Sequence, residues 1–177
     1  DLVELVVLGD SLVRKGRTTP EELVAAAETP GPHRRRARRA AGLVRREVDS
    51  PQESRLRMLI VLAGLPEPEV NVVFHDDSGT VRRRNDMGYR RYQLGFEFEG
   101  RQHAGSLQQW REDITRREEF DDLGWRLLLF VSEDLSERPE QTLERIVGVL
   151  RRQGCSEAKV RSTEWRRYFG PRWKRTA

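Results

Sequence analysis

The chain has 177 residues, enough for one full domain and an appendage. Its 33 Lys and Arg against 29 Asp and Glu give a formal net charge of +4, and 36% hydrophobic residues still allow a packed core. The single Cys155 excludes an intrachain disulfide and a zinc site built from cysteines, and no stretch approaches the roughly 20 apolar residues of a membrane span. Residues 1–12 are amphipathic, unlike a signal peptide, and lack an initiating Met, so we expect a fragment or trimmed chain from a reducing, cytoplasmic setting.

The first 49 residues predict helices only, as a connecting region. Apolar residues recur at helical spacing over 2–13. Thr19 and Pro20, followed by two acids, indicate the start of a second helix, because this order supplies a cap and suits the positive end of the helix dipole. An Arg-rich third helix is expected over 33–46.

From residue 50 to residue 153 the pattern changes to helices alternating with strands. The expected elements are a helix from Ser50 to Ala63, strands at Val70–Phe74, Thr80–Asp86 and Tyr92–Phe98, a helix at Ser106–Leu123, a strand at Trp125–Val131 and a helix at Arg138–Arg152. This order predicts an α/β fold with an antiparallel meander, a crossover helix and a buried strand, and helices on both faces of a mixed sheet.

Three carboxylates gather in the middle of this region. Asp86 is expected where the second strand ends, and Glu97 and Glu99 are two apart in the third, so their side chains share a face. Crowded carboxylates repel each other unless a cation lies between them, and oxygen ligands favour Mg²⁺ or Mn²⁺. The alternative is a solvent-facing pair at a strand edge. Because Leu94 and Phe96 place Glu97 in an apolar, central strand, we favour a metal site at Asp86, Glu97 and Glu99 that hydrolyses phosphodiesters.

Glu53 and His103 are supporting candidates. Glu53 lies three residues after Ser50, where a capping box places Glu, so a helix cap alone explains it unless the carboxylate reaches Asp86. His103 follows the turn at Gly100, where a histidine is a general base, a phosphate contact, a metal ligand or an exposed loop residue.

Basic residues lie outside this acidic centre, an arrangement that suits a protein holding a phosphate backbone near a metal. The nucleic-acid candidates are Gln102, Arg111, Arg116 and Arg117, with the Arg cluster 34–39 and the tail 154–177 as further contacts. The alternatives are ion pairs within the helix, solvated helix faces and, for the tail, aromatic side chains packed on the core. The tail interleaves aromatic with basic residues, which also suits nucleic acid.

Four motifs resemble the DUF559 family of actinobacterial proteins, which is similar to the very-short-patch repair endonucleases of the PD-(D/E)XK superfamily. They are Glu53-Ser54-Arg55-Leu56-Arg57, Asn85-Asp86-Met87-Gly88-Tyr89, Glu97-Phe98-Glu99-Gly100-Arg101-Gln102-His103 and Gly124-Trp125-Arg126. The resemblance covers about 50–152 and implies a restriction-endonuclease-like αβββαβ core behind an N-terminal helical appendage.

The resemblance also implies roles for individual residues. Asp86 matches the first metal-binding acid, Glu97 the acid of the second motif and Glu53 the acid on the first core helix. Two positions depart from the superfamily pattern: Asn85 stands where Pro is common, and Glu99 stands where the superfamily usually has Lys, although family members commonly carry an acid there. Water activation would then rest on the metal, His103 or a basic residue of the next helix.

We therefore expect a Mg²⁺-dependent (or Mn²⁺-dependent) DNA endonuclease or nickase. The alternative is a non-catalytic DNA-binding or antitoxin-like regulatory module that keeps the nuclease fold.

Overall fold

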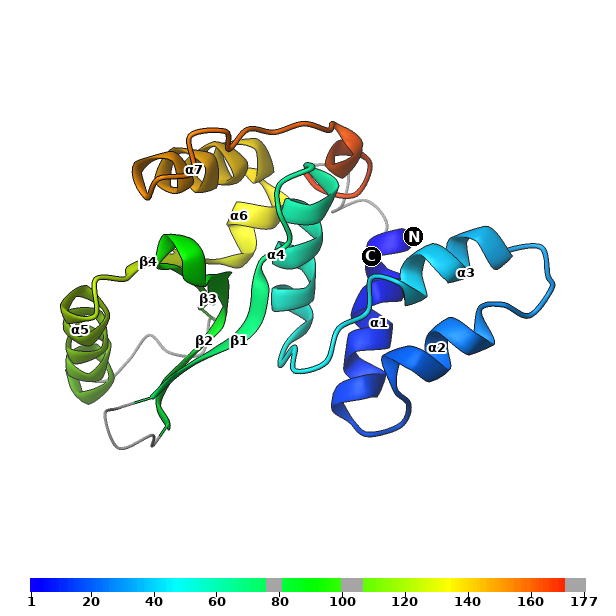
Figure 1. The fold of residues 1–177 in the computed structure, drawn as a ribbon, viewed down its shortest axis with the longest axis horizontal. Helices are drawn as coiled ribbons and strands as arrows, with labels where there is room; N and C mark the ends of the chain where they lie inside the picture. Colours follow the sequence, from blue (N-terminus) through cyan, green and yellow to red (C-terminus); the bar gives the residue numbers. More distant parts are fainter. Residues whose placement is uncertain (76–80, 100–106, 171–177) are drawn as a thin grey trace.

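The computed structural model describes residues 1–75, 81–99 and 107–170 (Figure 1). Its helices are α1 (Leu2–Arg14), α2 (Pro20–Ala26), α3 (Arg34–Ala41), α4 (Pro51–Leu62), α5 (Leu107–Asp122), α6 (Ser132–Ser136) and α7 (Pro139–Arg152), with short 3-10 turns η1 (Arg90–Tyr92) and η3 (Glu164–Arg167). The strands are β1 (Glu69–His75), β2 (Val81–Tyr89), β3 (Leu94–Phe98) and β4 (Arg126–Phe130).

The strands form one mixed sheet in the order β1-β2-β3-β4. The first three strands are antiparallel neighbours, and β4 lies parallel to β3 because α5 carries the chain back across the sheet. The α/β class, the meander and the crossover helix are thus confirmed.

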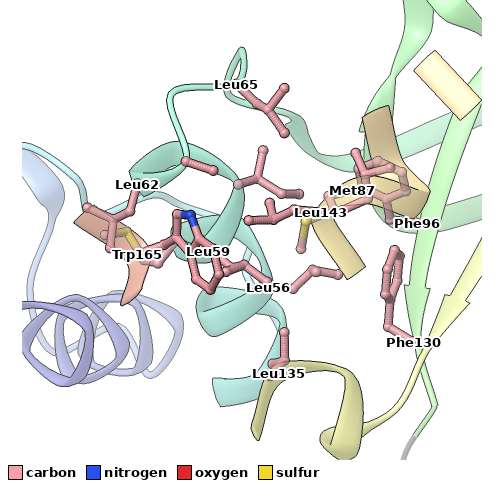
Figure 2. Close-up of a cluster of buried hydrophobic side chains, with 14 of the residues drawn as sticks. Leu56, Leu59, Leu62, Leu65, Met87, Phe96, Phe130, Leu135, Leu143 and Trp165 are labelled. Atoms are coloured by element: carbon pink, nitrogen blue, oxygen red, sulfur yellow. The ribbon is translucent and has the colours of Figure 1, made fainter. Parts of the chain in front are cut away.

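Helices lie on both faces of the sheet. The larger core lies between the sheet and α4, α6 and α7, and Figure 2 shows the leucines of α4 between Phe96 and Phe130 on one side and Trp165 on the other. On the opposite face, Phe120 of α5 packs with Phe74 of β1, whose ring also meets Trp125 edge to face at 4.6 Å. Helix α4 is buried around most of its circumference, as expected of a helix enclosed by other elements.

The N-terminal helices pack against α4 and share its core. Leu2, Val3, Val6 and Val7 of α1 belong to the same apolar cluster as the α4 leucines. In Figure 1 these helices lie on the side of α4 away from the sheet.

A buried ionic network reinforces this contact. The fully buried Arg57 of α4 pairs with Asp10 of α1 at 3.0 Å and with Glu67 at 2.9 Å. Ser54 also donates to Asp10 at 2.7 Å, and the backbone N–H of Arg45 donates to the same carboxylate at 2.8 Å. These bonds compensate much of the cost of burying two charges, so the network ties α1, the segment after α3 and α4 together.

Several expected boundaries were wrong. Strand β2 does not end at Asp86 but continues to Tyr89, because Met87 and Tyr89 are buried in the larger core. Strand β3 begins at Leu94, two residues later than expected, because η1 and the left-handed Gln93 (φ 46°) occupy the connection.

Two further differences concern helices. The Arg-rich helix α3 ends at Ala41 rather than near residue 46, and the five-residue α6 was not expected. In the tail, Trp165 and Phe169 are buried in the larger core, as the packing alternative proposed, whereas residues 171–177 lie outside the described part. None of the described helices has the length and apolar character needed to cross a bilayer.

Candidate functional site

The sheet forks between its two central strands. Strand β2 pairs with β1 from Val81 to Gly88, but its pairing with β3 covers only three residues and stops at Met87 opposite Phe96. Beyond that point β3 continues beside β4 as far as Phe98. The two strands therefore separate, and the polar groups at the root of the fork need partners other than a strand.

Asp86 lies at the root of this fork. Its Oδ2 accepts a hydrogen bond from the backbone N–H of Phe98 at 2.8 Å, so the carboxylate acts where a strand acceptor would otherwise be. Continuing the β2–β3 register by one residue sets Asp86 opposite Glu97. The eleven-residue spacing of the two acids matches this extrapolated register, at the point where β2 and β3 have already separated.

A break in side-chain alternation coincides with Asp86. Met87 packs in the larger core, but Val72, the partner of Asn85, packs in the smaller core on the opposite face of the sheet. Regular strands would place Asn85 and Met87 on the same face. Asn71, between the pairs that flank Asp86, has a left-handed φ of 49°. The local twist lets Asp86 interact both with β3 and with α4.

Glu97 is buried in β3, next to Phe96 of the larger core, so it points toward the α5 side of the sheet. Its neighbour in β4 is Leu129. Arg83 of β2 forms an ion pair with Glu119 of α5, and this hydrogen bond, with a smaller contribution from the charge of Glu97, raises the pKa of Arg83. A guanidinium that the sequence analysis did not select therefore lies within electrostatic reach of the site.

Glu53 combines a capping role with a position near Asp86. Its backbone N–H donates to Ser50 Oγ at 3.1 Å, and its Oε2 accepts from the N–H of Asp49 at 2.9 Å, one residue before the expected capping-box partner. Burial, and then the negative charge of Asp86, raise the pKa of Glu53 from 4.5 to about 7. Both interpretations of Glu53 therefore have support in the structure: it caps α4 and it interacts with Asp86.

The remaining candidates are exposed, or they lie outside the described residues. Glu99 follows the end of β3; its N–H donates to the Phe130 carbonyl at 2.8 Å, and its side chain is exposed, unlike that of Glu97. Gln102 and His103 lie outside the described residues, and so does the side chain of Arg116, while Arg111 and Arg117 are exposed on α5.

Beside Asp86 lies a buried amide with unusual surroundings. Neither polar atom of the Asn85 side chain has a hydrogen-bond partner among the described residues, although the residue is buried. Gly95 accommodates it, because a Cβ there would lie 2.1 Å from Asn85 Nδ2. A buried amide without a partner carries a free-energy cost, and functional sites are where such costs are tolerated.

A basic groove of about 320 Å³ borders the α5 face of β4, the outermost strand. Arg117, Arg126 and Arg145 surround Leu127 and Leu129, with a single acid, Asp121, among its lining residues. Arg145 donates to the Leu129 carbonyl at 2.7 Å, while Arg117 and Arg126 have no ion-pair partner in the described part of the chain. Since Leu129 neighbours Glu97, positive charge lies next to the acidic fork.

Sequence reasoning selected Arg117 but missed Arg126 and Arg145. Arg126 opens an apolar run that predicted only a buried strand, and Arg145 lies in the last helix. Only the packing of α7 beside β4 brings them together, and no local pattern encodes that contact.

Asp86, Glu97 and Glu53 suit a hard divalent cation in donor type. All three offer carboxylate oxygens, and Mg²⁺ usually binds one or two carboxylates while keeping several waters. Burial is the main reason for the raised pKa of Glu53, and the negative charge of Asp86, which a cation would balance, is the second. In the described ranges, however, no three His, Cys, Asp or Glu side chains are close enough to enclose an ion. The donor set therefore fits a cation held by two carboxylates and water.

Comparison with known proteins finds similar sequences, but their functions are not characterized. The uncharacterized proteins MT2308 and Rv2248 of Mycobacterium tuberculosis, from strains CDC 1551 / Oshkosh and ATCC 25618 / H37Rv, are each 31% identical to the chain over 99 residues. The match covers 55% of this chain but 36% of each relative, so the chain spans about a third of their length. No known family and no solved structure matches the chain.

Proposed function

We propose that this chain is a metal-dependent DNA endonuclease or nickase with a restriction-endonuclease-like core, related to the DUF559 proteins. The observation that supports this most strongly is the fork between β2 and β3, where Asp86 accepts from the Phe98 backbone N–H of β3 and its charge adds to the effect of burial in raising the pKa of Glu53 on α4. The carboxylates of Asp86 and Glu53 interact where the central strands separate, and the buried Glu97 lies on β3 beside that point, which favours a reaction site over a solvated strand edge.

In this proposal Asp86 and Glu97 would hold Mg²⁺ or Mn²⁺, and we expect their carboxylates to lie roughly 4 to 6 Å apart. The ion would lower the pKa of a bound water and stabilise charge on the phosphate during hydrolysis. Glu53 exchanges a proton near neutral pH, which is the property required of a general base or acid. Glu99, which follows β3, and His103, which lies outside the described residues, are further candidates.

The basic groove supports DNA as the substrate. Its arginines lie beside Leu129, the neighbour of Glu97, so a phosphate held there would place the adjoining backbone near the acidic fork. Arginine forks bind phosphate oxygens in a bidentate manner and resist loss of charge at any physiological pH.

The alternative is a DNA-binding or antitoxin-like module without catalysis. Two observations favour it: no group of three possible ligands encloses an ion within the described residues, and Glu99 replaces the lysine of the superfamily.

Plasmid nicking distinguishes the two functions. Wild-type protein, Asp86→Ala and Glu97→Gln are incubated with supercoiled DNA and Mg²⁺ or Mn²⁺, beside Glu118→Gln, which removes the same charge from an exposed position on α5. We expect nicking by the wild type and Glu118→Gln only, with DNA affinity nearly unchanged in all four. DNA binding without metal-dependent nicking by the wild type would support the binding module, and nicking that persists in Asp86→Ala would refute the site.

A further inference from the structure

Helix α3 carries five arginines in six positions, defined here as the arginine surface: Arg34, Arg35, Arg36, Arg38 and Arg39. Only two described carboxylates pair with them. Glu28 lies 2.7 Å from Arg34 and 2.9 Å from Arg38, and Glu164 accepts two bonds from Arg39 at 2.6 and 2.7 Å. Arg35 and Arg36 form no hydrogen bond or ion pair with other described residues. The surface therefore keeps an excess of three positive charges.

This charge pattern is unfavourable for an isolated helix. Arginines occupy the first turn of α3, where the helix dipole is positive, and its N-cap residue His33 makes no side-chain capping bond. Arg35 also repels Arg38 and Arg39, its neighbours one turn away. The adjacent α2 has the favourable arrangement at its N-terminus: Thr19 caps it, and acidic residues lie in its first turn. A bound polyanion would offset the repulsion between the arginines of α3, whereas α2 has no such repulsion to offset.

The arginine surface is also hollowed. One hollow of about 530 Å³ is lined by Arg35, Arg36 and Arg39 together with His33 and Tyr168, and a second of about 450 Å³ is lined by arginines of α3 alone. Hollows lined by guanidinium groups can each hold a phosphate, because the planar donor fork matches its oxygens. The Tyr168 ring adds an apolar wall suited to a sugar or base.

We infer that the arginine surface binds the phosphate backbone of duplex DNA. It lies at the opposite end of the molecule from α5 and the acidic fork in Figure 1, so it contributes affinity and not chemistry. The inference rests on DNA as the proposed substrate, but it does not require that the chain cleaves DNA.

The test measures binding of a fluorescent duplex by anisotropy in EDTA, which removes cleavage from the readout. The variant Arg35→Gln/Arg36→Gln deletes the two unpaired guanidiniums, and Lys159→Gln/Arg161→Gln deletes two exposed charges that do not belong to α3. At about 100 mM salt we expect the first variant to bind roughly tenfold or more weakly and the control to change less than about threefold. The slope of log affinity against log salt should fall by about 2, one counterion release per lost contact.

Thermal melting of the first variant should match the wild type or exceed it, because the substitution relieves repulsion and breaks no described bond. Equal loss of affinity in both variants would overturn the inference, since only net charge would then matter. Unchanged affinity in Arg35→Gln/Arg36→Gln, or wild-type binding to anionic phospholipid vesicles but not to DNA, would also overturn it. If Arg35→Gln/Arg36→Gln nicks DNA and binds it as tightly as the wild type, the inference fails and the proposed nuclease stands. If the wild type binds DNA through the arginine surface but does not nick it, the inference stands and the proposed nuclease fails.

Discussion

Glu53 makes the stability of the fold depend on pH in a direction opposite to that of a salt-bridged acid. Its pKa is about 7 in the folded chain against 4.5 for an exposed glutamate. Below 4.5 both states hold the proton. Between 4.5 and 7 only the folded state holds it, so stability falls as pH rises through this window, and above 7 the loss is complete.

The size of this loss follows from the shift. Each pKa unit corresponds to about 1.4 kcal/mol, so the window between the two pKa values costs roughly 2 to 3 kcal/mol for a carboxyl that keeps some contact with solvent. Glu53→Gln keeps an oxygen that accepts from the Asp49 N–H and has no charge to bury. We therefore expect the variant to gain stability over the wild type by this amount between pH 4.5 and pH 8.

Urea unfolding of both proteins, followed by tryptophan fluorescence across this pH range, measures the difference directly. Subtracting the two curves cancels the titrating groups that do not interact with Glu53. A matched control is Asp86→Asn, which removes the second cause of the raised pKa, so adding Glu53→Gln to this variant should have a smaller effect than adding it to the wild type. A difference that stays constant within about 0.5 kcal/mol from pH 4.5 to pH 8 would refute the raised pKa of Glu53, and an equal effect of Glu53→Gln in both backgrounds would refute its placement beside Asp86.

Three other predictions concern the fork and the core. Gly95→Ala should cost about 1 to 3 kcal/mol of unfolding free energy, since its Cβ would clash with the Asn85 amide, and adding Asn85→Ala should restore most of the loss in denaturant titrations; simple additivity would contradict this. Arg57→Ala should lower the unfolding free energy by about 3 to 5 kcal/mol in the same assay, because Asp10 stays buried without its cation. A loss below about 1 kcal/mol would show that the network contributes little to stability. Glu97→Gln should melt higher than the wild type without metal, while millimolar Mg²⁺ should stabilise the wild type more; a wild type unaffected by cations removes the catalytic assignment and leaves the fold.

The spacing of hydrophobic residues along the chain determined how much of the fold could be predicted from the sequence. The alternation at Leu94 and Phe96 and the apolar run before Phe130 predicted the central and outer strands, because both strands are buried in one sheet. The end of β2 could not be predicted, because Met87 and Tyr89 are drawn into the core by α4, a partner distant in sequence. The short α6 lacks the length to show a period at all.

The site was predictable only as far as it is local in sequence. The spacing of Asp86 and Glu97 across one turn predicted neighbouring strand positions, and the paired register of β2 and β3 ends one residue before these two acids. Glu53 showed no local sign beyond its cap, since its second role depends on where α4 packs. Arg145 showed none, because it reaches β4 only through the docking of α7.

The buried pairing of Arg57 with Asp10 decides how small a piece of this protein can be produced. A fragment starting at residue 50 retains every strand of the sheet but loses Asp10, the Arg45 backbone donor and the leucine and valines that cover α4. Such a fragment would keep Glu67 as a partner of Arg57 but would lose Asp10, and it would place this half-paired guanidinium within an exposed apolar surface, a combination that favours aggregation of truncated domains. Deletion mapping of activity should therefore cut before α1, because a fragment that begins at α4 would lose solubility and be mistaken for one that had lost its active site.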